Sequence, residues 1–477
     1  MDQKKTPLAD ALKKMRDDAY VPFDVPGHKA SLSFLSDYFG SDCVELDFNS
    51  RKSIDYLCDP KGVILEAEQL AAEAFSAKDA FFMTGGTTSA VQAMIMSTCS
   101  PGDKIILPRN VHYSVIYAVI ISGAVPVYIN PSIHERMGIS LAMDVRSLSE
   151  CLDANCDAKA VVVNNPTYYG ICSDLPAIVE LAHSRGVKVL ADEAHGAHFY
   201  FSDRLPVGAM QCGADMSAVS MHKTGGSLTQ SSILLSSGTI ARDHVENTIN
   251  LTRSTSSSYL LMASLDLARR NLVMSGKEAL DRVIDMCEKT RKEINAIGPY
   301  RAFSDDVVDG VCVCDFDKTK ISVNTSGLGL AGIEVYTLLR DKYGIQVEFG
   351  DICNLLAIST IADSEASHSA LVSALADIAK KHSAVESIEY TYEYIEPKVE
   401  MTPRDAFYSE KENLPIDSAL GRISAMSVMC YPPGIPLLAP GELVTAEIID
   451  HVKLASEKGC SVTGLVRENE ITVVKNK

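Results

Sequence analysis

Several features that mark particular classes of protein are missing from this chain of 477 residues. None of its thirteen cysteines stands in a Cys-x-x-Cys pair, so neither a zinc site nor a disulfide framework is indicated. Lysine and arginine total 44 against 62 aspartates and glutamates, and the formal charge of −18 disfavours nucleic acids as partners. The longest apolar run, residues 115–129, is broken by Gly123 and Pro126 and is shorter than the roughly 20 residues of a membrane span. We expect no metal, no nucleic acid and no membrane partner.

The composition that is present indicates a globular protein. Hydrophobic residues make up 46% of the chain and charged residues 22%. The first 18 residues are charged and lack the apolar core of a signal peptide, and unpaired thiols suit a reducing compartment. We therefore expect a cytoplasmic protein, and a prior of roughly 150 residues per domain suggests about three domains.

Short apolar runs alternate with amphipathic helical patterns through the first half of the chain. The runs predict strands at 81–83, 104–107, 125–129, 160–163, 187–191 and 216–220. The helical patterns fall at 90–98, 114–122 and 175–185. Such alternation is typical of an α/β fold with a largely parallel sheet covered by helices on both faces. Ligands of such sheets bind in the loops beyond the carboxyl ends of the strands.

Changes of pattern along the chain predict four parts. They are an N-terminal arm (1–30), a large domain (31–297), a small α/β domain (298–391) and a C-terminal domain (392–477). A long helix, about 256–296, ends the large domain, and the small domain includes strands at 311–313 and 346–348. The C-terminal domain is marked by proline-punctuated segments.

Two residues supply the minimum chemistry for holding pyridoxal 5′-phosphate. Lys223 follows one predicted strand, and Asp192 ends another. A lysine can form an imine with the aldehyde of this cofactor, and a carboxylate keeps the pyridine nitrogen protonated, so that the ring withdraws electrons from a carbanion. Lys223 could instead be a solvated surface charge, and Asp192 could cap a helix or bind a metal with His195 and His198. The pair predicts a pyridoxal-phosphate enzyme.

A glycine-rich turn precedes the first helix of the predicted sheet. It reads Thr84-Gly85-Gly86-Thr87-Thr88, and its backbone N–H groups, hydroxyls and helix dipole suit a dianionic phosphate. Ser220 and His222 can reach the same phosphate if the chain turns sharply before the lysine. Glycine-rich turns before helices are also common where no phosphate binds.

Two further loops offer contacts to the ring of the cofactor. His112 follows a predicted strand and could stack on the pyridine, although it could equally be structural. Asn165 and Thr167 follow the predicted strand 160–163 and are placed to contact the ring hydroxyl, although turn chemistry alone would explain Asn165-Pro166.

Four segments of the sequence resemble the bacterial ornithine/lysine/arginine decarboxylase family, whose members are fold-type-I pyridoxal-phosphate enzymes. These segments are Pro26–Lys29, Asp192–His198, Ser220–Lys223 and Tyr431–Glu442. The resemblance spans essentially the whole chain. It implies an aspartate-aminotransferase-like large domain with a mostly parallel sheet, a small α/β domain and a C-terminal α+β decarboxylase domain.

The resemblance also implies a role for each residue of the site. Lys223 would bond the cofactor, Asp192 would hold the pyridine nitrogen, and His112 and Ala194 would lie on the two faces of the ring. The catalytic residues that it implies are Lys223, His222, Asp192 and His112. Further cofactor-binding residues are Gly85, Gly86, Thr87, Thr88, Asn165, Thr167, His195, Ser220, His222 and Thr229, the last reaching the phosphate of a neighbouring subunit.

The resemblance to the shorter members of the family implies decarboxylation of a basic amino acid, L-arginine to agmatine and carbon dioxide, in polyamine biosynthesis. Lysine and ornithine are alternative substrates, and an aminotransferase or aldolase on the same fold is an alternative reaction. A non-enzymatic regulator or scaffold is a third hypothesis. The resemblance further implies a homodimer, or a dimer of dimers, with active sites at the subunit interface.

The sequence leaves two roles open. Glu348 and Asp351 are candidates for recognising the side chain of the substrate, although both could be ordinary surface charges. Lys223 and His222 are both candidates for the proton donor to the Cα atom of the substrate.

Overall fold

The structure, a computed structural model, describes residues 1–382, 395–430, 434–467 and 469–476 and divides into two compact units. The first unit comprises Met1–Thr98 and Val189–Leu280, and the second comprises Cys99–Lys188 and Asp281–Lys477. The predicted domain boundary at 391 and the motif residues Tyr431–Pro433 lie outside the described residues. The four-part division of the chain stays a prediction.

Four neighbouring strands form the sheet of the first unit. In spatial order they are β1 (Asp79–Met83), β10 (Ser232–Ser236), β9 (Met216–Val219) and β8 (Lys188–Glu193). β8 and β9 run parallel, whereas β10 runs antiparallel to β9 and to β1. Nearly all of their side chains are buried, as near-continuous apolar strands require when both faces of a sheet are covered.

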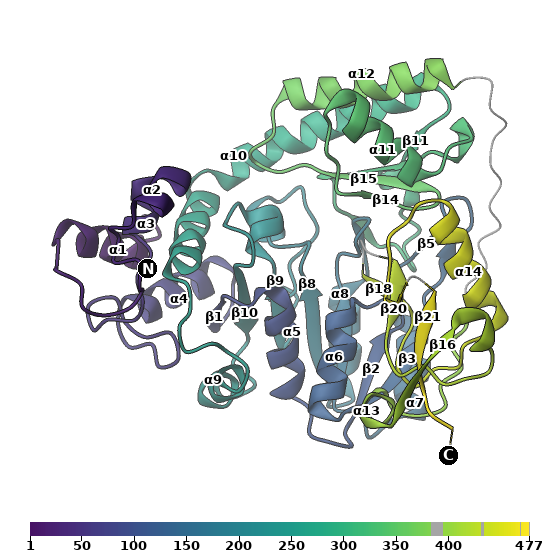
Figure 1. Ribbon diagram of the computed structural model, residues 1–477, viewed down its shortest axis with the longest axis horizontal. Helices are drawn as coiled ribbons and strands as arrows, with labels where there is room; N and C mark the ends of the chain where they lie inside the picture. Colours follow the sequence, from purple (N-terminus) through teal and green to yellow (C-terminus); the bar gives the residue numbers. More distant parts are fainter. Residues whose placement is uncertain (383–394, 431–433, 468, 477) are drawn as a thin grey trace. The chain divides into compact units, whose positions relative to one another are not determined.

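Helices cover these strands of the first unit. α5 (Gly86–Met96) packs against β9 and β10, and α4 (Val63–Ala74) packs against β1 (Figure 1). α1 (Pro7–Asp17) packs in turn against α4 through its buried Leu8, Leu12 and Met15. The predicted long helix is confirmed as α10 (Tyr259–Ile297), whose 39 residues run from the first unit into the second.

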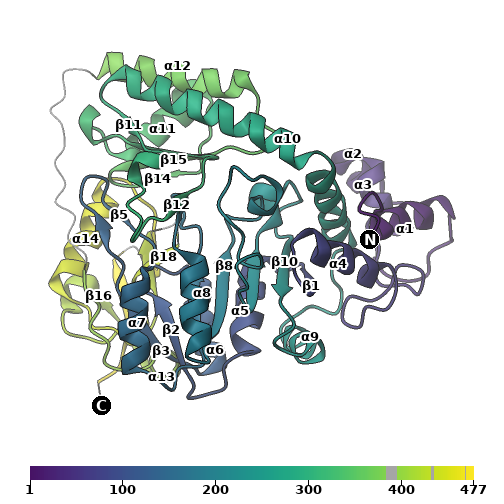
Figure 2. The same ribbon diagram turned by 180° about the vertical axis from the view of Figure 1, so that it is seen from behind.

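The second unit contains three parallel strands. β2 (Lys104–Pro108) lies between β3 (Val125–Ile129) and β6 (Ala160–Asn164). The helices that follow them are α6 (Tyr113–Ser122), α7 (Val145–Ala154) and α8 (Leu175–Ser184), of which α7 and α8 lie side by side (Figure 2). The predicted α/β class with a mostly parallel sheet is confirmed. Among the described residues, no helix combines the length and apolar character that crossing a membrane requires.

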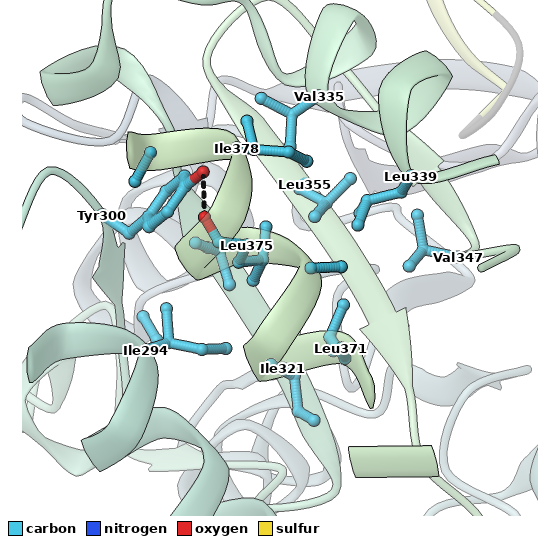
Figure 3. Packing of buried hydrophobic residues seen from close by; sticks show 14 of the residues in the cluster. Ile294, Tyr300, Ile321, Val335, Leu339, Val347, Leu355, Leu371, Leu375 and Ile378 are labelled. Carbon is cyan, nitrogen blue, oxygen red and sulfur yellow. Dashed lines mark hydrogen bonds between the residues drawn. The ribbon is translucent and has the colours of Figure 1, made fainter. Parts of the chain in front are cut away.

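A small antiparallel sheet of the second unit carries its own core. Its strands, in spatial order, are β11 (Arg301–Ala302), β13 (Lys320–Asn324), β15 (Asn354–Ile358) and β14 (Phe349–Gly350). α11 (Gly332–Tyr343), α12 (Glu365–Lys381) and the end of α10 pack on it through buried aliphatic side chains (Figure 3). The buried Tyr300 hydroxyl donates to the carbonyl oxygen of Leu375 at 3.1 Å, which offsets the cost of removing a phenol from water.

Two strands predicted in this region are wrong. Residues 311–313 form a loop, because the Asp309 carboxylate accepts their three backbone N–H groups at 2.8–2.9 Å and leaves none for a sheet partner. Residues 346–348 precede β14, which begins at Phe349.

Small antiparallel sheets and a helix follow at the C-terminus, as the predicted α+β class requires. One sheet is formed by β16 (Lys411–Pro415), β21 (Glu470–Val474) and β20 (Leu465–Val466), and another by β18 (Ile435–Leu438), β17 (Val428–Cys430) and β19 (Val462–Thr463). α14 (Ala446–Glu457) packs into the same core. α13 (Pro403–Tyr408) packs on α6, where Arg404 donates to the carbonyl oxygens of Ile120 and Ile121 at 3.0 and 2.9 Å.

Candidate functional site

Lys223 lies on a tight turn directly after β9. Met221–Gly225 form a single π-helical turn, a geometry that is rare and frequent at functional sites. The turn begins at the buried Ser220, whose carbonyl accepts the Lys223 N–H at 3.1 Å, and ends at Gly226, whose φ of +84° suits glycine. The lysine is thereby held at the carboxyl end of a buried strand, as the sequence predicts.

Asp192 and His195 lie at the end of β8, the parallel neighbour of β9. The Asp192 carboxylate is buried and accepts the Ala194 N–H at 3.1 Å. Burial raises its pKa above the usual range, against the effects of the Ala194 N–H and of the charge on Lys223. His195 Nε2 lies 2.9 Å from Lys223 Nζ. Among the described residues, no three His, Cys, Asp or Glu side chains gather as a metal site would need.

Glu193 is a positioning residue that the sequence reasoning missed. It lies inside the first unit, fully buried, and accepts hydrogen bonds from the Ser217 hydroxyl of β9, from the Tyr200 hydroxyl at 2.6 Å and from the Ala209 N–H at 2.8 Å. Burial raises its pKa to about 7. These bonds hold the end of β8 against β9, and so fix the residues on either side of Glu193. A charged residue inside an apolar strand is the signal that could have identified it.

The glycine-rich turn forms the N-terminus of α5. Gly86 has a φ of +73°, and its N–H donates to the carbonyl oxygen of Gln230 at 2.9 Å. The positive φ of Gly86 favours glycine, and a side chain at Gly85 would approach the Ser89 hydroxyl to 2.7 Å, so that this hydroxyl would have to move. The Thr87 hydroxyl lies 2.8 Å from that of Ser232, and Thr88 is half-buried in the same turn.

The start of β10 connects the glycine-rich turn with the lysine turn. Ser231 precedes Ser232 and its carbonyl oxygen lies 3.1 Å from His222 Nδ1, while the Ser220 hydroxyl lies 3.2 Å from the same nitrogen. Thr229 is exposed on the intervening loop. The structure thus brings together, within the first unit, Gly85, Gly86, Thr87, Asp192, Ala194, His195, Ser220, His222 and Lys223.

His112 belongs to the second unit and is the N-cap residue of α6. Its Nδ1 accepts the Ser114 N–H at 3.2 Å and lies 2.8 Å from the Ser114 hydroxyl. Because Nδ1 is an acceptor, the neutral ring carries its proton on Nε2. Nδ1 of His112 therefore caps α6, and the stacking of the ring on a cofactor stays a prediction.

Asn165 and Thr167 also belong to the second unit, and their side chains form hydrogen bonds within the turn that follows β6. The buried Asn165 side chain accepts the Ser173 N–H at 2.9 Å, and the Thr167 hydroxyl accepts the Ile171 N–H at 3.2 Å. Both side chains have the turn role that the sequence left open. Their roles in binding a cofactor stay predictions.

The second unit also encloses a cavity of about 630 Å³ with acidic groups in its wall. Glu348 accepts the Tyr168 hydroxyl at 2.8 Å and is otherwise exposed to the cavity. Asp351 accepts the Tyr169 hydroxyl and the N–H groups of Cys353 and Asn354 at 2.8 and 2.6 Å. Asp351 therefore serves the local loop, whereas Glu348 can accept donors from a ligand.

The residues of the first unit fit pyridoxal phosphate. Asp192 is a buried carboxylate with a raised pKa, which a pyridinium N–H would stabilise. Lys223 presents its amine on the neighbouring strand end, and the N-terminus of α5 adds backbone N–H groups and two hydroxyls for a phosphate.

Two family models match the chain. Residues 6–367 match the model described as Orn/Lys/Arg decarboxylase, major domain, and residues 386–474 match that of the C-terminal domain. The chain is 42% identical over 471 residues to the arginine decarboxylase of Bacillus subtilis (strain 168), covering 97% of this chain and 96% of that one. It is 24% identical over 567 residues to the inducible lysine decarboxylase of Escherichia coli (strain K12), covering 96% and 78%.

Solved structures agree on the fold. The lysine decarboxylase of Francisella novicida superposes with a TM-score of 0.86 at 21% identity, over 98% of this chain and 81% of that one. A ureidoglycine-glyoxylate aminotransferase from Bacillus subtilis superposes with a TM-score of 0.55 at 16% identity, over 69% and 86%. The predicted fold-type-I architecture is confirmed.

Proposed function

The chain belongs to the Orn/Lys/Arg decarboxylase family, and from that membership we propose that it converts L-arginine to agmatine and carbon dioxide in polyamine biosynthesis. The observation that carries the pyridoxal-phosphate chemistry is Lys223 on a tight turn beside the buried carboxylate of Asp192. The match to the decarboxylase family supports decarboxylation as the reaction type. The choice of arginine is supported by identities of 41–42% to four arginine decarboxylases, against 24% to a lysine decarboxylase.

Pyridoxal 5′-phosphate, bound through Lys223, would supply a ring that takes up the electron pair left at Cα when the carboxylate departs. Asp192 would bind its pyridine nitrogen, and the backbone N–H groups and hydroxyls at the start of α5 would bind its phosphate. We propose that this group would also be contacted by the residues that the family resemblance implies, His112, Ala194, Ser220, His222 and Thr229. Its ring hydroxyl would be contacted by Asn165 and Thr167, which follow β6.

We assign the proton donor to Cα to Nζ of Lys223 rather than to His222. The His222 ring contacts both the Ser220 hydroxyl and the Ser231 carbonyl, and these contacts hold it in place. The Lys223 amine ends a flexible side chain, so Nζ would be able to move toward Cα of the substrate and deliver a proton there.

We propose that Glu348 binds the guanidinium group of the substrate. It is the acidic group of the cavity whose oxygens are not used by the backbone, and a carboxylate can accept a guanidinium through two parallel hydrogen bonds. The two arginines that line the cavity already have carboxylate partners, since Arg109 pairs with Glu442 and Arg340 pairs with Asp341.

Glu348→Gln is expected to lower kcat/KM for arginine by about 100-fold, because a desolvated guanidinium would lose its charged partner. The loss should be smaller for a substrate without a guanidinium, so the arginine-to-lysine ratio of kcat/KM reports the effect. Glu365→Gln, an exposed carboxylate of α12, is the matched control and should leave the ratio unchanged. An unchanged ratio in Glu348→Gln would refute the assignment.

Incubation with arginine, lysine and ornithine in turn tests the reaction itself. We expect carbon dioxide and agmatine, with the highest kcat/KM on arginine. Cadaverine or putrescine as the main product would establish one of the alternative substrates. Keto-acid formation without carbon dioxide would instead establish an aminotransferase.

We further propose a homodimer that works in the cytoplasm. The thirteen cysteines are free thiols, which suits a reducing compartment. Residues 20–39, which include α2 (Ser33–Phe39), expose large apolar side chains. Phe23 is 95% exposed and Tyr38 is 83% exposed, and such apolar surfaces mark interfaces. Light scattering should give twice the 51.6 kDa chain mass. Phe23→Ser with Tyr38→Ser should halve it, and a monomeric unsubstituted chain would contradict the proposal.

A further inference from the structure

Two basic side chains meet in the first unit. His195 Nε2 lies 2.9 Å from Lys223 Nζ, and the His195 side chain is buried. At this distance the two side chains together carry a single positive charge, because two adjacent positive charges away from water repel each other. One nitrogen then donates a hydrogen bond and the other accepts it.

The backbone holds both residues at this distance. β8 and β9 pair in parallel with Glu193 opposite Val219, so the turns that follow them emerge side by side. The Gly196 N–H donates to the carbonyl oxygen of Glu193 at 2.8 Å and closes the turn that carries His195. The side chain of Glu193 anchors that turn to β9 from within.

We propose that His195 is a positioning residue that supplies the proton delivered by Lys223, an inference that rests on the proposed decarboxylation. The bond between Cα and the carboxylate carbon breaks, and carbon dioxide leaves without a proton. The electron pair left at Cα takes a proton from Nζ of Lys223. Nζ regains a proton from Nε2 of His195, and His195 regains one from water. The sum is one proton consumed for each carbon dioxide released.

Several other titratable groups near the pair form hydrogen bonds of their own, which leaves the transfer of a proton to Lys223 to His195. Titratable groups of the adjoining elements include Asp192 and Glu193 at the end of β8, His198 and Tyr200 beyond the same turn, and His222 on the turn after β9. Asp192 is the proposed partner of the pyridine nitrogen, and its carboxylate already accepts a hydrogen bond from the Ala194 N–H. Glu193 and Tyr200 bond each other, and His222 contacts Ser220 and Ser231. His195 contacts Nζ directly, with its Nε2 at 2.9 Å.

The test compares the holoenzyme with its His195→Gln variant, since glutamine can still accept a hydrogen bond from Nζ but carries no titratable proton. In the unsubstituted enzyme, kcat should fall as the pH rises between about 5 and 7, because His195 must be protonated to supply the proton. This falling limb of the pH profile is the signature of His195. The variant should lose that limb, and its kcat should fall by about 10- to 100-fold with KM unchanged. A retained limb would overturn the proposal. A rise in KM with kcat unchanged would do the same, because it indicates a binding role.

Two further measurements separate this proposal from a loss of structure and from the proposed function. His198→Gln, a buried histidine of the same segment, is the matched control and should keep the limb. In the cofactor-free protein, NMR titration of the His195 ring should give a pKa at least one unit higher after Lys223→Met, since the neighbouring positive charge is then removed. An unchanged value would overturn the pairing. Failure of the unsubstituted enzyme to release carbon dioxide would reject the proposed function, whereas the NMR result would stand.

Discussion

Lys223→Ala is expected to lower kcat on arginine by about 10⁴-fold or more. The substitution removes both the amine that bonds the cofactor and the proposed proton donor to Cα. The lysine is only half-buried, and the π-helical turn is held by backbone bonds to Ser220 and from Gly226, so the fold should be retained. Release of carbon dioxide measures the loss, and an unchanged circular dichroism spectrum checks the fold.

Borohydride reduction followed by peptide mass spectrometry tests the same residue without turnover. The unsubstituted protein should carry the cofactor mass on the peptide that contains Lys223, and Lys223→Ala should carry none. Lys277→Ala is the matched control, because Lys277 is an exposed lysine of the same unit that pairs with Asp203. Cofactor trapped on another lysine of the Lys223→Ala protein would reject the assignment, and so would full activity of the variant.

The sequence predicted the elements whose apolar periodicity is strong. α10 was expected at about 256–296 and occupies 259–297, because amphipathic spacing persists there without proline. The strand β10 was missed, although its Ile233–Leu235 run is apolar and as long as the run predicted at 81–83, because serines stand on both sides of it. The strand expected at 311–313 fails for a different reason. The side chain of Asp309 takes the N–H groups that a strand would share, and such a bond depends on local geometry rather than on hydrophobic pattern.

The residues of the candidate site that lie at the carboxyl ends of strands could be predicted from the sequence. Asp192 lies at the end of β8 and Lys223 follows the adjacent β9, which agrees with the expectation that the carboxyl ends of strands carry function. The sequence could not show that Asp351 is used by its own loop whereas Glu348 faces the cavity, since both are acidic residues three positions apart. Nor could it show the contact between His195 and Lys223, which depends on how two turns emerge from paired strands.

One ion pair of the second unit joins residues that lie far apart in the sequence. Arg109 follows β2, and its Nε and Nη2 donate to the two carboxylate oxygens of Glu442 at 2.8 and 2.7 Å. Its Nη1 donates to the carbonyl oxygen of Pro436 at 2.7 Å. The two side chains are 4% and 1% exposed. A buried pair of this kind gives little net stability over apolar residues, but breaking it leaves an uncompensated charge.

Glu442→Gln is therefore expected to lower the free energy of local opening of β17 and β18 by about 3–5 kcal/mol, which hydrogen exchange of their amides measures. The double variant Arg109→Met with Glu442→Leu should recover much of that loss, because it removes both charges and fills the space with apolar atoms. Glu412→Gln breaks the more exposed pair with Arg422 and should have little effect. If Glu442→Gln is as mild as Glu412→Gln, water reaches the buried pair. If the double variant is worse than the single one, the hydrogen bonds of Arg109 to the backbone outweigh its charge, and the pair acts through geometry rather than electrostatics.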